Sequence, residues 1–206
     1  MFVLPCISMI LFFVANMMIS VLGPFYFEGV MDYTPSQVGL IYLIIPAIMV
    51  IGAPVTGWIY GKHQFRYLAA LGMMIVAFSI LLLGYLAGAN GSDPRILLLT
   101  FVSMGIGGVL FSGPNNTEIM RALPRANVNI ASSFSATIRN LGMALGVSLS
   151  SVLVSLQLLQ AGYYGTLVEA APTLLSAIIS RVIILAGMLC IIGTLVSIYR
   201  GMNSAA

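Results

Sequence analysis

Residues 67–87, YLAALGMMIVAFSILLLGYLA, form an apolar run without a charged side chain. A helix needs about 20 apolar residues to cross the hydrocarbon core of a bilayer, so this run is long enough to span one. Five further, largely apolar stretches occupy most of the chain, at residues 2–29, 35–60, 95–121, 129–160 and 178–200. Because lipid cannot satisfy backbone N–H and C=O groups, we predict that all of these stretches are helices rather than open sheet.

The composition is that of a protein surrounded by lipid. Hydrophobic residues make up 60% of the 206 and charged residues only 6%, and the mean hydropathy is +1.09. An ordinary soluble domain has about 25% charged residues, so this chain cannot build a water-facing surface. The first apolar run also lacks the basic flank and small-residue cleavage site of a signal peptide. We therefore predict one all-α, multi-pass integral membrane domain over residues 1–206.

The distribution of charge predicts how the helices are oriented. Basic residues gather at the gaps after the second, fourth and sixth runs: Lys62, Arg66, Arg121, Arg125 and Arg200. At the other gaps the charged residues are Arg95 and the acids Glu28, Asp32, Asp93 and Glu169. Cytoplasmic loops are enriched in Lys and Arg, so we expect both termini to face the cytoplasm from the inner (plasma) membrane. Bases that are spread over alternate gaps do not indicate a nucleic-acid partner.

Sequence patterns for enzymatic or metal chemistry are absent. The chain has one histidine, and Cys6 and Cys190 lie inside apolar runs, where cysteine behaves as a small hydrophobe. No cysteine pair has metal-ligand spacing, and no phosphate-binding glycine loop precedes a lysine. We expect no enzymatic activity, no bound metal and no cofactor.

Arg139 is the most informative single residue. A charged side chain inside a membrane span costs about 2.5 to 3.5 kcal/mol on insertion scales and usually faces a cavity or a partner. Two interpretations stay open: Arg139 lies at the cytoplasmic headgroups, if residues 141–159 alone cross the membrane, or it faces a substrate cavity. An ion pair with Glu118 is the less favoured idea. In a simple hairpin about Pro124 the two side chains lie about 12 Å apart along the axis, at 1.5 Å per residue.

Two asparagines form a second polar feature within a span. Asn115 and Asn116 directly follow Gly113 and Pro114. A proline inside a helix frees a backbone carbonyl, and amide side chains there can line a substrate path or join helices to one another. Of these two roles, joining helices is slightly favoured.

A face of the fifth run combines small and polar residues. Gly142 and Gly146 are four residues apart on the face that also holds Ser135 and Arg139. Small residues at this spacing let two helix backbones approach closely in a membrane. We therefore assign Gly142 and Gly146 to helix packing, and keep Ser135 with Arg139 among the substrate or coupling candidates.

Four stretches resemble motifs of major facilitator superfamily transporters, in particular the fourteen-helix drug:proton antiporter branch. Residues 24–40, PFYFEGVMDYTPSQVGL, resemble that branch's P-x-Y-L-Q … G-Y-S-P-x-x-A-G-L passage. Residues 113–124 are similar to its P-x-N-x-x-I-M … V-P, and residues 131–146 to its A-S-G … R-x-x-G-x-A-L-G helix. Residues 54–66 resemble the superfamily's cytoplasmic G-x-L-x-D-R-x-G-R-R loop, matching it at Gly57, Lys62 and Arg66.

The resemblance implies a fold and a function. The chain would correspond to the C-terminal six-helix half of the fold, built from two inverted triplets, without the N-terminal half. It would be a half-size transporter for small amphipathic or cationic compounds, as in multidrug efflux, with proton coupling as an open question. Two identical copies would rebuild a twelve-helix carrier, whose cavity is lined by the first, second, fourth and fifth helices of each.

Two other readings of the function are less favoured. The chain could be a truncated, non-transporting half or a membrane subunit that packs against another protein. A small channel is disfavoured, because neither a ring of charges nor a filter-like loop is evident.

The charge pattern makes a direct prediction of topology. In a variant without the native cysteines, single cysteines at His63 and Ala122 should react with an impermeant thiol reagent only from the cytoplasmic side. A cysteine at Gly91 should react only from outside. Labelling in the reverse pattern would invert the predicted orientation.

Overall fold

The structure of the protein, a computed structural model, describes residues 3–63, 65, 67–89, 93–122, 124, 128–167 and 170–203. These residues contain the six helices α1 (Val3–Gly29), α2 (Pro35–His63), α3 (Leu68–Gly88), α4 (Pro94–Arg121), α5 (Val128–Gln160) and α6 (Pro172–Asn203). Each helix is long and apolar enough to cross a membrane. The predicted all-α membrane fold with six spanning helices is confirmed.

Local side chains explain where two of the helices begin. At the start of α2 the Thr34 N–H donates to Gln37 Oε1 at 2.9 Å, and the Gln37 N–H donates to Thr34 Oγ at 3.4 Å. This reciprocal arrangement satisfies N–H groups that have no partner inside the helix. Asp93 does the same for α4, where its carboxylate accepts from the Arg95 N–H at 2.9 Å. Pro94 and Pro35 fill first-turn positions at which a missing N–H costs nothing.

The sixth helix begins earlier than residue 178, where the sequence placed it. It starts at Pro172, so the residues just before 178 also belong to it. The Ser180 hydroxyl donates to the Gly84 carbonyl of α3 at 2.7 Å. This bond fixes the early turns of α6 against α3, and Arg181 on the same turn is exposed.

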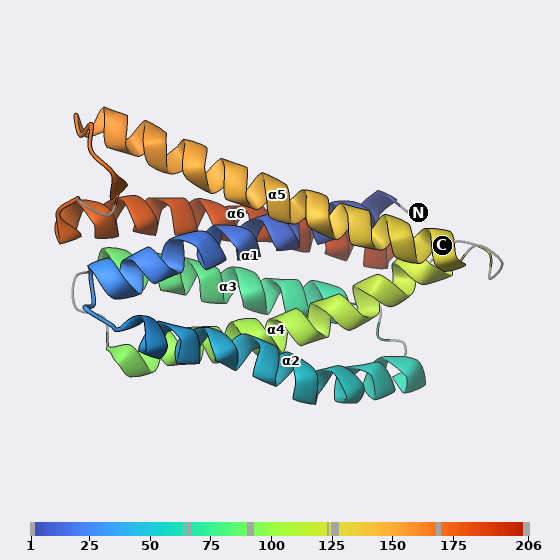
Figure 1. The fold of residues 1–206 in the computed structure, drawn as a ribbon. Coiled ribbons are helices and arrows are strands. Elements are labelled where there is room, and N and C mark those ends of the chain that lie inside the picture. The colour runs from blue at the N-terminus through green and yellow to red at the C-terminus, as the bar shows by residue number, and fades with distance from the viewer. Residues whose placement is uncertain are drawn as a thin grey trace.

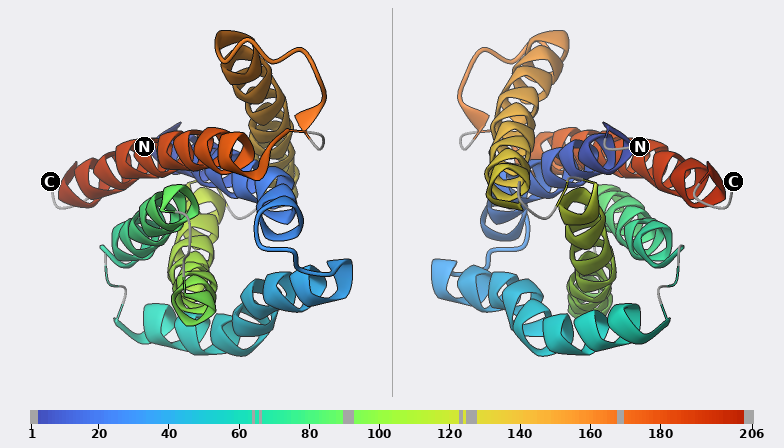
Figure 2. Two further views of the ribbon diagram at one scale, coloured as in Figure 1. Left: turned by 90° about the vertical axis from the view of Figure 1, so that its left-hand side faces the viewer. Right: turned by 90° about the vertical axis from the view of Figure 1, so that its right-hand side faces the viewer.

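The helices follow an order in space that differs from their order in the chain. α3 packs against α4 and α6, α1 packs against α5 and α6, and α2 packs against α4. The resulting row, α2–α4–α3–α6–α1–α5, curls round so that α2 and α5 form its two edges (Figures 1 and 2). Both ends of the chain lie at one end of the bundle, here called the termini end (Figure 1).

Burial divides the helices into inner and edge members. More than half of the most apolar window is buried in α1 and α3 (56% each), against 28% in α5 and 6% in α2. The buried core comes mainly from α1, α3, α4 and α6, with Met18, Met73, Phe101 and Ile179 at its centre. α2, which contains Pro46 and Pro54, follows an arc along the outside of the bundle (Figure 2). Most of its surface is therefore left to lipid or to another protein.

Glycines allow two of the helix contacts to be very close. A Cβ on Gly72 of α3 would lie 2.5 Å from the Phe111 backbone nitrogen of α4. A Cβ on Gly146 of α5 would lie 2.6 Å from the Val14 carbonyl oxygen of α1, and one on Gly142 would lie 3.0 Å from the Ile10 oxygen. The small-residue motif that the sequence assigned to packing thus lies directly on the α1 backbone.

The α1–α5 contact can be tested with a single methyl group. Gly146→Ala should lower the free energy of unfolding by about 1–3 kcal/mol, because a backbone oxygen cannot move aside as a side chain can. Gly57→Ala is the matched control, since nothing lies within 4 Å of a Cβ at that position. Alanine is favoured over glycine by about 1 kcal/mol inside a helix, so the control should be neutral or stabilising. Unfolding in mixed micelles measures the free energy of both variants. An equal loss of stability in Gly146→Ala and Gly57→Ala would contradict the close α1–α5 contact.

Candidate functional site

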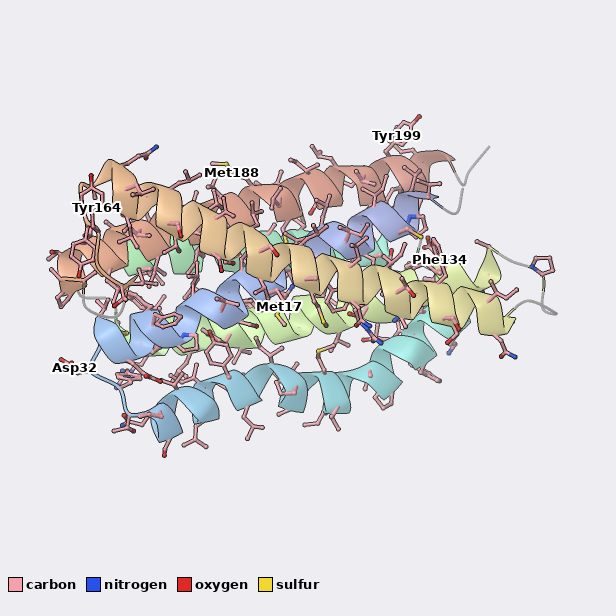
Figure 3. The ribbon with its side chains drawn as sticks, turned by 45° about the horizontal axis from the view of Figure 1, so that its top comes forward. Met17, Asp32, Phe134, Tyr164, Met188 and Tyr199 are labelled. Carbon is pink, nitrogen blue, oxygen red and sulfur yellow. The ribbon has the colours of Figure 1, made fainter. Side chains whose placement is uncertain are left out.

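A cavity of about 290 Å³ lies among four helices near the termini end of the bundle. Its walls are Met9 and Phe13 of α1, Met49 of α2, Phe111, Ser112, Asn115 and Asn116 of α4, and Arg139 and Met143 of α5. A second cavity of about 200 Å³ shares Phe13, Met49, Ser112 and Met143 with the first. Together they follow the face between the edge helices, and Met17, which lines the second, lies about midway along the bundle (Figure 3). The helices involved are those that the family resemblance assigned to a central cavity.

The structure places Arg139 in the wall of this cavity. Its side chain is exposed on α5, and no ion-pair partner for it occurs among the residues that the structure describes. One turn earlier, the Ser135 hydroxyl donates to Asn116 Oδ1 at 3.1 Å. Ser135 and Asn116 therefore tie α5 to α4 directly beside Arg139.

Asn115 and Asn116 have different surroundings although they are neighbours. Asn115 is almost fully buried; its Nδ2 donates to the Pro5 carbonyl at 3.1 Å and its Oδ1 accepts from Arg200 Nη1 at 2.7 Å. It connects α4 to α1 and α6. Asn116 is half-buried and bonds to Ser135. Each amide joins helices and each lines the cavity, and their role in a substrate path stays a prediction.

Glu118 forms an ion pair with Arg200 of α6. Arg200 Nε lies 2.8 Å from Glu118 Oε2, and the Tyr60 hydroxyl donates to Glu118 Oε1 at 3.3 Å. Arg200 is only 3% exposed. In the sequence, Arg200 is one of the basic residues that predict the topology. The structure gives it a second role, because α6 packs beside α1 and α3 and its last turn reaches α4. Counting residues along the α4–α5 hairpin could not reveal this partner.

Gly113 and Pro114, which precede Asn115 in α4, differ in burial. Pro114 is buried inside the helix. Gly113 is exposed, and a Cβ there would make an ordinary 3.8 Å contact with Thr56. The Thr117 hydroxyl donates to the Gly113 carbonyl at 2.9 Å. Close packing therefore does not require a glycine at position 113.

The predicted loop residues lie apart from the cavity. Gly57 and Lys62 are exposed near the end of α2, and Lys62 Nζ lies 5.2 Å from the centre of the Trp58 ring. Arg66 lies outside the described residues. No group of three or more His, Cys, Asp or Glu side chains that could hold a metal occurs in the part of the chain that the structure describes.

The buried pair predicts a specific pattern of stability. Arg200→Met should lower the free energy of unfolding by about 3 kcal/mol, because it leaves the Glu118 carboxylate without its arginine. Adding Glu118→Leu should recover part of this loss, since the effects of substitutions within one network on the free energy of unfolding are not additive. Arg181→Met, on an exposed arginine of the same helix, should change stability by less than about 0.5 kcal/mol. A double variant that loses the sum of both single losses would show that the two side chains do not interact.

Comparison with known proteins gives the chain a family. The family model described as Major Facilitator Superfamily matches residues 2–147. The chain is 32% identical over 136 residues to the riboflavin transporter RibZ of Clostridioides difficile, covering 66% of this chain and 29% of that protein. It is 32% identical over 171 residues to the uncharacterized transporter YebQ of Escherichia coli, covering 82% and 35%. It is 28% identical over 134 residues to the multidrug resistance protein Stp of Mycobacterium tuberculosis, covering 63% and 24%.

These matches agree with the geometry described above. The chain spans about a third of the length of these relatives, or less. The match to the family model covers more than half of the chain, from α1 into α5, and so includes the four helices that line the cavity. The chain belongs to the Major Facilitator Superfamily of membrane transporters.

Proposed function

We propose that this chain is a half-size transporter that assembles as a homodimer into a twelve-helix carrier for small amphipathic compounds. The observation that supports this most directly is the cavity among α1, α2, α4 and α5, which combines Phe and Met walls with amide, hydroxyl and guanidinium groups. Methionine and aromatic surfaces adapt to apolar ligands of different shape. Two relatives are a riboflavin transporter and a multidrug resistance protein, which favours a small organic substrate.

The exposed polar face of one copy supports pairing. Arg139 is exposed on α5, which together with α2 forms the two least buried edges of the bundle. Polar and charged side chains that face hydrocarbon are expensive, so a partner that encloses this face would stabilise it. A second copy in the same orientation would do so about a two-fold axis along the membrane normal, and closed two-fold pairs are the commonest oligomers.

The alternative is a six-helix unit whose partner has a different sequence, or a half that does not transport. In that case the same face would be covered by other helices, whether in a longer chain or in a separate protein. The two ideas differ in one measurable quantity, the number of identical protomers in the functional particle.

Counting protomers tests the proposal. Photobleaching of singly labelled protein in nanodiscs should show two steps. In a background without Cys6 and Cys190, Met143→Cys on the cavity wall should give a cross-linked dimer with a bifunctional thiol reagent. Phe78→Cys is the matched control, because it is exposed on α3, between α4 and α6 and away from the edge helices. A single bleaching step, or cross-links only to a different protein, would reject the homodimer.

A further inference from the structure

We infer that the cavity selects amphipathic anions, with Arg139 binding the anionic group and the apolar walls holding the rest of the molecule. This inference rests on the proposed function, because it assigns a substrate class to the same cavity. It narrows the substrate classes that the family resemblance implied, amphipathic or cationic compounds, and excludes the cationic one.

The charges of the described residues are the first argument. Among the residues that the structure describes, Arg139 is the only formally charged one that lines either cavity. Asp32 lies at the opposite end of the bundle from Phe134, which precedes Arg139 on α5 by just over one turn (Figure 3). Glu118 is near the termini end but is already bonded to Arg200 and Tyr60. No described acid therefore neutralises the guanidinium of Arg139, and the cavity carries a net positive charge.

The polar groups beside Arg139 are the second argument. Ser135 already donates to Asn116 Oδ1, so the Asn116 amino group is the part left to meet a ligand. Asn115 Oδ1 likewise accepts from Arg200. Asn115 also donates to Pro5, so both ends of its buried amide are engaged. The groups that remain on the wall are the Asn116 amino group and the Arg139 guanidinium, both donors, and the Ser112 hydroxyl, which can donate as well; donors suit an anion. A guanidinium can bind a carboxylate through two parallel hydrogen bonds.

The apolar groups are distributed unevenly along the two cavities, which is the third argument. Arg139 and Asn116 line only the first cavity. The second extends to Ile45, Met104 and Met17 and has no charged group among the described residues of its lining; its polar groups are the uncharged side chains of Asn16, Ser20 and Ser112. Between them the cavities follow α1 from Met9 to Ser20, or about 16 Å at 1.5 Å per residue. A ligand with an anionic group at one end and a fused aromatic ring at the other matches this division. In a homodimer each copy would add one Arg139 to the shared cleft.

A series of probes with one shape and different charge tests the inference. Binding of naphthalene-2-carboxylate, naphthalene-2-carboxamide and naphthalen-2-ylmethylammonium is measured on protein in phosphatidylcholine nanodiscs, with empty nanodiscs subtracted. The native protein should bind the carboxylate about ten-fold more tightly than the carboxamide, with the ammonium weakest. Arg139→Gln should bring the affinity for the carboxylate to within about two-fold of that for the carboxamide. Arg139→Lys should be intermediate, since it keeps the charge but loses the fork.

Arg181→Gln is the matched control, since Arg181 is an exposed arginine of a spanning helix that lines neither cavity. It should preserve the full preference for the carboxylate. Preference for the ammonium probe, or a carboxylate preference that survives Arg139→Gln, would overturn the inference. Protomers are counted on the same samples. A dimer without charge preference rejects the anion site alone, and a monomer with an Arg139-dependent preference rejects only the homodimer.

Discussion

The contacts at the termini end depend on Arg200, a buried charge in a membrane-spanning helix whose Nε and Nη1 are bonded by groups from α4. Its guanidinium contacts the carboxylate of Glu118 and the amide oxygen of Asn115, while Tyr60 of α2 donates to the same carboxylate. Asn115 also donates to Pro5 of α1. Lipid offers no hydrogen bonds, so each of these groups depends on the others. These contacts fix the termini end of the bundle. Asn115, which takes part in them, also lines the first cavity.

The existence of the helices followed from the sequence, whereas their arrangement did not. An apolar run of more than about 20 residues bounded by turn residues leaves little choice but a spanning helix. The predicted start of α6 was too late because Arg181 interrupts the apolar pattern, although the Ser180 hydroxyl beside it donates to the Gly84 carbonyl of α3. The order of neighbours depends on close contacts such as Gly72 of α3 against the α4 backbone. Hydropathy contains no information about such contacts.

The candidate site was predictable to the extent that one helix face carries it. Helical periodicity alone places four residues on one face: Ser135, Arg139, Gly142 and Gly146. In the structure these residues have different contacts. The two glycines pack against the α1 backbone, Ser135 bonds to Asn116 of α4, and Arg139 lines the cavity. The partner of Glu118 could not be predicted, because it is Arg200, from the last turn of α6.

Arg200 and Arg139, which both lie near the termini end, have different electrostatic roles, and the role of Arg139 depends on Arg200. Glu118 is the one acid that the structure describes at that end of the bundle, and its charge is taken up by Arg200. If Arg200 were absent, Glu118 would be the nearest carboxylate available to the cavity, and its charge would oppose that of Arg139. Opposite charges in a low-dielectric surrounding interact strongly even without direct contact. The buried pair therefore stabilises the packing of α4 and α6 and also keeps the cavity positive.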